Sequence, residues 1–357
     1  MKPFPIIILF LLIFFYCTPK KEINIHAYAP FAVQRGTNIA HWLSQSQRRG
    51  AERASFFTEK DIAFIAASGF DHIRLPLDEE QMWDEAGNRN EDAFGLLNQC
   101  LTWCAQKSLR VIVDLHILRS HHFNADEKPL WTDPLEQDKF IGLWKDLSLF
   151  LKAWPNGMVA YEMMNEPVAD NADQWNQLLM RAVDSIRHWE KNRVLVIGSN
   201  RWQSATTFDQ LKVPANDPNI LLSFHFYEPF FLSHFQASWT HLKDFEGAVQ
   251  YPGQIVLDGD EEAHQRIYNR DTLIKMMAKP LKLADSLHLP LYCGEFGIID
   301  KAPRPSKISW YKDMVSIFEE YHIGYANWNF KAGSFGIVDG ELKPDEEVVR
   351  ILTHQTP

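Results

Sequence analysis

The chain has 357 residues and a formal net charge of −10; 46% of its residues are hydrophobic, 13% aromatic and 23% charged. This composition is typical of a globular protein with a large core and excludes a disordered or fibrous chain. No lysine- or arginine-rich run is present, which argues against a nucleic acid partner because phosphate backbones are bound by basic patches. The 12 Trp, 24 Phe and 10 Tyr residues fit either a large core or a cleft lined with flat apolar faces.

The first residues have the pattern of an export signal. Lys2 precedes an unbroken apolar run over residues 6–16, a length typical of signal peptides and shorter than the roughly 20 residues of a membrane-spanning helix. Cys17 follows the run directly, as in bacterial lipoproteins that are cleaved before a cysteine and acylated on it. Tyr16 departs from that pattern, which has a small residue before the cysteine.

The alternative to acylation is an ordinary signal peptide that is cleaved further along, at Ala27-Tyr28-Ala29. We expect a signal peptide over residues 1–17, a short tether over 18–30 and one catalytic domain over 31–357. The protein is therefore expected to be exported, either as a cell-envelope lipoprotein attached to the membrane through Cys17 or as a secreted or periplasmic protein.

Three further cysteines, Cys100, Cys104 and Cys293, give neither a disulfide framework nor a zinc site, because their number is odd and no Cys-x-x-Cys is present. Cys100 and Cys104 are four residues apart in a helical pattern and therefore lie on one helix face. They are interpreted as core-facing thiols, with a bridge between them as the alternative.

From residue 31 onward, a short β-rich run, a polar turn and a stretch with helical spacing recur along the chain. Thr58-Glu-Lys-Asp61 has the form of a helix N-terminal capping signal, and the stretch from Trp175 to Val183 is apolar at i, i+3 and i+4. The eight strand-like runs are residues 31–33, 70–75, 110–115, 158–163, 193–197, 220–224, 290–293 and 324–328.

Strands that alternate with helices predict a parallel sheet with right-handed crossovers. Eight such units favour an α/β fold of the closed (β/α)₈ TIM-barrel type, and an open doubly wound sheet is the alternative. One connection is much longer than the others and rich in aromatic residues and glycine. It runs from Tyr227 to about Ala263, between the sixth strand and its helix, and connections of this length are usually functional.

Polar and ionisable residues stand at the ends of the predicted strands, which is where the active site of such a barrel lies. These residues are Arg74, His116, Asn165, Glu166, His225, Tyr227, Glu295 and Trp328. Glu166 follows the fourth strand and Glu295 the seventh, so the two carboxylates face each other across the barrel mouth. Hydrolysis of a glycosidic bond needs such a pair, one protonated acid and one ionised nucleophile or base.

The ordered set of motifs resembles glycoside hydrolase family 5, the cellulase family of retaining enzymes on (β/α)₈ barrels. The resemblance spans almost the whole chain after the signal. It rests on Arg35-Gly-Thr-Asn38, His72-Ile-Arg74-Leu-Pro76, Asp114-Leu-His116, Asn165-Glu166-Pro167, His225-Phe-Tyr227, Gly294-Glu295-Phe-Gly297 and Trp328.

The resemblance implies a role for each of the strand-end residues. Glu166 is the acid/base and Glu295 the nucleophile, which Arg74 and Tyr227 hold and ionise, Arg74 by lowering its pKa. The remaining roles are that Asn165 binds the sugar 2-hydroxyl, His116 and His225 orient the sugar and the carboxylates, and Trp328 stacks under the sugar beside the scissile bond.

Other residues have either a substrate role or a packing role. Trp42 and His41 follow the first strand and either reach the sugar or pack. Loop aromatic residues with the same two interpretations are Trp131, Trp202, Phe230 and Trp239. His116, His121 and His122 superficially resemble a metal cluster, but the strand-end histidine is better explained by the glycosidase set.

We expect a retaining hydrolase of a neutral β-linked glucan, similar to a cellulase or endo-β-1,4-glucanase, acting as a monomer without cofactor, metal or separate carbohydrate-binding module. Alternative substrates of the same mechanism are β-1,3-glucan, β-mannan and xyloglucan, because loops set the specificity of such barrels. Two other classes remain open: a non-catalytic sugar-binding protein on the same barrel, and a metal-dependent hydrolase, which a chelator would inactivate.

Overall fold

The computed structural model describes residues 30–255 and 267–354, and eight of its strands close into a parallel barrel. The barrel strands are β1 (Arg35–Asn38), β2 (His72–Asp78), β3 (Arg110–Ile117), β4 (Val159–Glu162), β5 (Leu195–Ile197), β6 (Ile220–Phe226), β9 (Leu291–Phe296) and β10 (Gly324–Asn327). Their order around the barrel is β1-β10-β9-β6-β5-β4-β3-β2. This closed order confirms the predicted (β/α)₈ barrel and excludes the open sheet.

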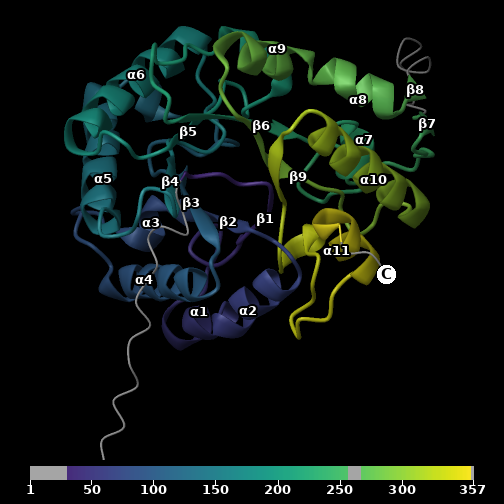
Figure 1. Ribbon diagram of the computed structural model, residues 1–357, viewed down its shortest axis with the longest axis horizontal. Coiled ribbons are helices and arrows are strands. Elements are labelled where there is room, and N and C mark those ends of the chain that lie inside the picture. Colours follow the sequence, from purple (N-terminus) through teal and green to yellow (C-terminus); the bar gives the residue numbers. More distant parts are fainter. Residues whose placement is uncertain (1–29, 256–266, 355–357) are drawn as a thin grey trace, which may run out of the picture.

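Helices surround the barrel on all sides (Figure 1). They are α1 (Gly50–Phe56), α2 (Glu59–Ala67), α3 (Glu79–Met82), α4 (Glu91–Gln106), α5 (Pro134–Leu151), α6 (Ala172–Trp189), α7 (Phe230–Ser233), α8 (Arg270–Met276), α9 (Ala278–Leu287), α10 (Arg304–Glu320) and α11 (Glu346–Thr353). Among the described helices, none is long and apolar enough to cross a membrane. The predicted signal peptide with Cys17, and all of the tether except Pro30, lie outside the described residues.

The helix signals in the sequence have clear structural counterparts. The Asp61 carboxylate accepts a hydrogen bond from the Thr58 backbone N–H at 2.8 Å, which fixes the start of α2. Cys100 and Cys104 are both buried on α4, and neither they nor the buried Cys293 form a disulfide among the described residues. The interpretation as core-facing thiols is confirmed.

The predicted first strand is wrong in position. Residues 31–33 are not a strand, and β1 begins at Arg35 instead. Phe31 and Val33 are partly buried and pack against the lower interior of the barrel. Their apolar character therefore reflects a plug at the end of the barrel, whereas the strand itself carries Thr37 and Asn38, two buried polar residues that a β-propensity pattern does not reveal.

The barrel interior is apolar at one end and polar at the other. The apolar layer consists of Ile112, Ala160, Val196, Leu221, Tyr292 and Ala326. Because side chains on one face of a strand recur every second residue, the next layer toward the carboxyl ends holds Arg74, Asp114, Glu162 and Ser223. The layer above presents His116 and His225. This polarity places the chemistry at the carboxyl ends of the strands.

A shift of register in β9 places Glu295. Phe224 of β6 pairs with Cys293, but its neighbour His225 pairs with Glu295, so β9 has one extra residue at this point. A bulge of this kind re-aims the side chains that follow it. Glu295 therefore lies beside His225 at the barrel mouth.

The long connection after β6 has structure of its own. It contains α7 and β7 (Gly253–Gln254), which pairs in antiparallel fashion with β8 (Ile267–Tyr268) just before α8. The predicted end of this connection, near Ala263, lies outside the described residues. Its described part carries a cluster of aromatic rings that reaches from Tyr227 through His234 to Trp239 and Phe335.

We expect Gly36→Ala to lower the free energy of unfolding by about 1–3 kcal/mol, because overpacking a tight core has a cost of this order. An alanine Cβ at this position would lie 2.3 Å from His72 Nε2, and the His72 ring is held by Asp71 and the Tyr292 hydroxyl. Urea denaturation measures the change. The control is Gly95→Ala on the exposed face of α4, where a Cβ meets nothing within 4 Å.

The control variant should be stabilised by about 0.5–1 kcal/mol, since alanine is the better helix former. Equal stability of the Gly36→Ala and Gly95→Ala variants would contradict the tight contact between β1 and β2.

Candidate active site

Arg74 lies at the centre of the polar layer and is fully buried. All three nitrogens of its guanidinium have side-chain partners. Nε donates to Glu162 at 2.6 Å, and Nη1 donates to Asn38 at 2.9 Å and to Glu295 at 2.7 Å. Nη2 donates to Asn165 at 2.8 Å and lies 3.0 Å from the Asp114 carboxylate. A planar guanidinium with five donors suits this multiple contact, which an ammonium group cannot provide.

Glu295 is held at both carboxylate oxygens. Oε1 accepts from Arg74, and Oε2 accepts from the Tyr227 hydroxyl at 3.0 Å. These two donors favour the ionised form and fix the direction in which the carboxylate points. The sequence-predicted neighbours of Glu295 are therefore its actual neighbours.

Glu166 has a different environment. Its Oε1 lies 2.9 Å from Nδ1 of His225, and its backbone has φ of +44°, in the left-handed region that non-glycine residues rarely adopt. A strained backbone of this kind costs about 1–3 kcal/mol and is concentrated at functional sites. The Glu166 N–H donates to the side-chain oxygen of Gln203 at 2.9 Å, which stabilises this conformation.

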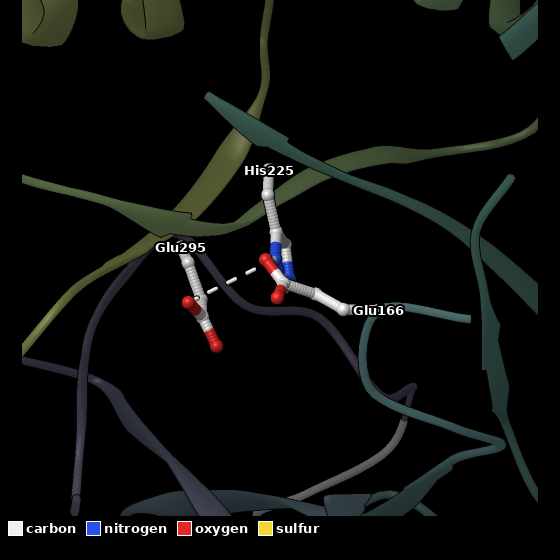
Figure 2. Close-up of side chains that lie close together, drawn as sticks. All are labelled: Glu166, His225 and Glu295. Atoms are coloured by element: carbon white, nitrogen blue, oxygen red, sulfur yellow. Dashed lines mark hydrogen bonds and ion pairs between the residues drawn. The ribbon is translucent and has the colours of Figure 1, made fainter. Parts of the chain in front are cut away.

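The two carboxyl groups face each other across the site (Figure 2). One oxygen of Glu166 and one of Glu295 lie within 4.8 Å of each other, and both lie near His225 Nδ1. Retaining glycosidases have carboxyl groups about 5–5.5 Å apart, whereas inverting ones need about 6.5–9.5 Å to admit a water. The close approach of these two oxygens favours the retaining arrangement.

The pKa values of the two carboxyl groups differ because their surroundings differ. Burial, and next the negative charge of Glu295, raise the pKa of Glu166 well above its ordinary value. Burial also raises the pKa of Glu295, while the positive charge of Arg74 and the hydrogen bond from Tyr227 oppose the rise. Arg74 thus lowers the pKa of Glu295 as expected, but burial outweighs it. The pKa of Glu166 is thus raised more strongly than that of Glu295, which favours Glu166 as the group that holds a proton.

Both histidines of the site are neutral at neutral pH. Burial lowers the pKa of His116 to about 4, and burial together with the Arg74 charge lowers the pKa of His225 well below its ordinary value. Nδ1 of His116 lies 2.6 Å from the Asp114 carboxylate, and its ring is parallel to that of Trp328, with the centroids 5.7 Å apart. His116 therefore supports the Trp328 ring from one side.

Two side chains of the site have capacity left to bind a ligand. Asn165 uses its oxygen to accept from Arg74, and its buried Nδ2 has no partner among the described residues. Trp328 is only partly buried. An unpaired amide donor and a partly exposed indole ring are groups that suit a sugar ring and its hydroxyl groups.

The structure separates the other aromatic candidates into core and surface residues. Trp42 is fully buried, and its Nε1 donates to the Arg53 carbonyl, so it packs and does not reach the cleft. Trp131 is mostly buried against His121 and Trp175. The remaining candidates stay near the surface: Trp202 is 43% exposed, Trp239 is 56% exposed and Phe230 stacks between His234 and His241. His41 lies at the edge of Trp328.

The three histidines that resemble a metal cluster do not converge on one point. His121 Nε2 accepts from the Val168 N–H and His122 Nδ1 from the Asn124 N–H, while His116 faces Asp114. Within residues 30–255 and 267–354, the one group whose atoms could surround a cation is Glu166, His225 and Glu295. The guanidinium of Arg74, 2.7 Å from Glu295, places a positive charge beside that position and opposes a cation there.

Sequence reasoning missed two buried residues of the site, Glu162 and Gln203. Glu162 carries a signal that could have been used, since a carboxylate in the apolar run of β4 must find a partner when buried. Gln203 follows β5 in a polar stretch, and nothing in its neighbourhood of the sequence distinguishes it. Asp114 belongs to a motif already singled out, but its role beneath His116 becomes visible only in three dimensions.

Comparison with known proteins gives the same assignment. The family profile described as Cellulase (glycosyl hydrolase family 5) matches residues 25–334. The chain belongs to glycosyl hydrolase family 5. Endoglucanase C of Acetivibrio thermocellus is 35% identical over 343 residues, which cover 90% of this chain and 98% of that protein. Cellodextrinase A of Ruminococcus flavefaciens is 27% identical, covering 81% of this chain and 83% of that one.

Solved structures share the barrel. One titled as a glycoside hydrolase superposes with a TM-score of 0.76 at 23% identity and covers 90% of this chain and 99% of that one. Thermotoga maritima Cel5A in complex with mannotriose superposes with a TM-score of 0.73 at 23% identity, covering 92% and 99%. At 23% identity, these structures support the fold of this family 5 member but give no evidence about its substrate.

In the Glu295→Gln variant, we expect the pKa of Glu166 to fall relative to the wild type. The substitution removes the negative charge that, after burial, contributes most to raising it. Carbon-13 NMR of protein labelled at the glutamate carboxyl carbons measures the titration. The control is Glu59→Gln on the exposed start of α2, which should leave the Glu166 titration unchanged. An unchanged or higher pKa of Glu166 in Glu295→Gln would show that the two groups are not coupled.

Proposed function

We propose that this family 5 member hydrolyses internal β-1,4 bonds of a neutral glucan with retention of anomeric configuration. The observation that carries the proposal is the pair of facing carboxyl groups within 4.8 Å, of which only Glu295 is held by Arg74 and Tyr227. If both carboxyl groups had the same surroundings, they would have the same protonation state, and one could not act as acid while the other acts as nucleophile.

The first step forms a covalent glycosyl-enzyme. The sugar at the cleavage point lies on Trp328, with its 2-hydroxyl toward Asn165 Nδ2. A Glu295 oxygen attacks the anomeric carbon while Glu166 gives its proton to the departing glycosidic oxygen, so that the glycosidic bond breaks as the ester bond forms.

The second step reverses these roles. Glu166, now ionised, takes a proton from a water molecule, whose oxygen attacks the anomeric carbon from the side that the leaving group vacated. The ester bond to Glu295 breaks, and Glu166 is protonated again. Two inversions at one carbon give net retention.

The substrate assignment rests on similarity and on the surface of the molecule. The relatives include an endoglucanase at 35% identity, and the net charge of −10 disfavours anionic polysaccharides. Exposed Trp202 and Trp239 offer flat faces for further sugar rings. The alternatives of β-1,3-glucan, β-mannan and xyloglucan are outcomes of the test below. Since every site residue comes from one chain, we also propose that the enzyme acts as a monomer, which analytical ultracentrifugation tests.

Glu295→Gln and Glu166→Gln should each lower kcat/KM on β-1,4-glucan by about 10²-fold or more, because each removes a group that acts in the transition state. The assay covers carboxymethyl-cellulose, barley β-glucan, laminarin, glucomannan and xyloglucan, with product anomers followed by NMR. Glu59→Gln serves as the control of unchanged activity.

The β-anomer should form first from a β-glucan. Initial formation of the α-anomer would refute retention. A wild type that cleaves none of the glycans, and binds them no better than the two site variants do, would instead favour the sugar-binding protein.

We further propose that the chain is exported and acylated on Cys17, on the basis of the apolar run that precedes this residue. Expression of the full chain in a bacterium fed an alkyne-bearing fatty acid should label the wild type, and Cys17→Ser should abolish the label. Cys100→Ser is the matched control, since that thiol is buried. An unlabelled wild type whose mature N-terminus follows Ala29 would establish ordinary signal cleavage instead.

A further inference from the structure

The connection after β5 carries a buried glutamine that reaches beneath the acid/base. Gln203 is fully buried. Its side-chain oxygen accepts from the Glu166 N–H at 2.9 Å, and its Nε2 donates to the Glu162 carboxylate at 3.1 Å and to the Ser223 hydroxyl at 3.3 Å. The amide therefore uses both its ends within the site.

The partners fix the orientation of this amide. A backbone N–H can only donate, so the atom facing Glu166 is the oxygen and the atom facing Glu162 is the nitrogen. Glu162 in turn accepts from Nε of Arg74 at 2.6 Å. The backbone of the acid/base is thereby connected, through two side chains, to the guanidinium that holds Glu295.

The loop that delivers Gln203 is strained. Arg201, Trp202 and Gln203 are three successive residues in the left-handed region, with φ of 60°, 59° and 50°. Residues with side chains visit this region singly as a rule, so a run of three is retained only where the surroundings impose it. A Cβ on Gly198 would lie 2.6 Å from Cγ of Gln203, so the glycine leaves the space that the amide occupies.

The same loop also makes backbone hydrogen bonds to the segments that carry Glu166 and His225. The Trp202 N–H donates to the Pro167 carbonyl at 3.3 Å, and the His225 N–H donates to the Gln203 carbonyl at 3.0 Å. Glu166 and His225, whose side chains lie 2.9 Å apart, are thus both fixed at the backbone by the loop. Gln203 itself touches neither the reacting carboxylate oxygens nor the cleft.

We propose that Gln203 is a positioning residue for the acid/base: it holds the Glu166 backbone in the conformation that aims the protonated carboxyl at the leaving oxygen. The proposal rests on the function proposed above. It predicts a defect mainly in proton transfer, because Gln203 bonds directly to the Glu166 N–H but reaches Arg74 only through Glu162.

Substrates with different leaving groups separate such a defect from general damage. A dinitrophenyl β-cellobioside releases a stable phenolate and needs no proton, whereas cellotetraose releases a sugar alkoxide that must be protonated. For both substrates, kcat/KM reports the first step. Misplacement of Glu166 lowers it for cellotetraose only, while damage to Glu295 or to the fold lowers it for both.

The variants are Gln203→Met, which keeps the shape but neither hydrogen bond, and Gln203→Glu, which keeps an acceptor for the Glu166 N–H. Gln210→Glu, at an exposed position of the same connection, is the matched control. For Gln203→Met we expect kcat/KM to fall by about 10- to 100-fold on cellotetraose and by less than about threefold on the aryl cellobioside. Gln203→Glu should lie between Gln203→Met and the wild type.

Azide provides a second measure, because it attacks the glycosyl-enzyme without base assistance. It should raise kcat of Gln203→Met on the aryl cellobioside and yield a β-cellobiosyl azide, without effect on the wild type or on Gln210→Glu. Equal losses on the two substrates in the variant that keeps the wild-type melting temperature, or no response to azide, overturn the proposal. A wild type that cleaves neither substrate overturns the proposed function instead, so the two failures are distinguishable.

Discussion

One buried guanidinium organises the site. Arg74 contacts Asp114, Glu162 and Glu295 in a layer closed off from water, so a single positive charge stands against several carboxyl groups. Burying an ionised group without a partner is very costly, so carboxyl groups in excess of this one positive charge tend to bind protons. Burial raises the pKa of Asp114 to about 7 and raises that of Glu162. Because the folded protein binds protons that the unfolded chain releases, these groups favour folding less as the pH rises from the ordinary carboxyl range toward the raised values.

The same constraint divides the work between two identical side chains. Glu166 and Glu295 are both glutamates at the mouth of one barrel, and what separates them is the set of donors each receives. Glu295 takes one hydrogen bond from Arg74 and one from Tyr227, whereas Glu166 faces a neutral imidazole. Positioned donors of this kind stabilise negative charge without reorganisation during the reaction. The barrel supplies the rigid frame, and the donors supply the asymmetry.

The sequence predicts the barrel, seven of its eight strands and the strand-end residues, because alternation, order and motif spacing are local signals. It does not predict what lies below the rim. Glu162 contacts Arg74 and Gln203 contacts Glu166, which lie 88 and 37 positions away in the chain. A carboxylate in an apolar strand signals that Glu162 needs a partner, but one sequence does not identify that partner, and Gln203 carries no such signal. For Trp42 the sequence leaves a sugar contact and packing both open, and the structure decides for packing in the core. The first strand is predicted too early because apolar residues 31–33 resemble a strand, whereas the strand that follows them carries buried polar residues.

The apolar layer beneath Arg74 determines how protons enter the site. Tyr292, Ile112 and their neighbours fill the barrel below the charged groups, and the Tyr292 hydroxyl is already occupied by His72. Among the described residues, this floor leaves the barrel mouth as the side from which water reaches the carboxyl groups. In the proposed second step, the proton that left with the first sugar is replaced by one from the water that enters through this mouth. The apolar floor thus makes water and sugar share one route to the carboxyl groups.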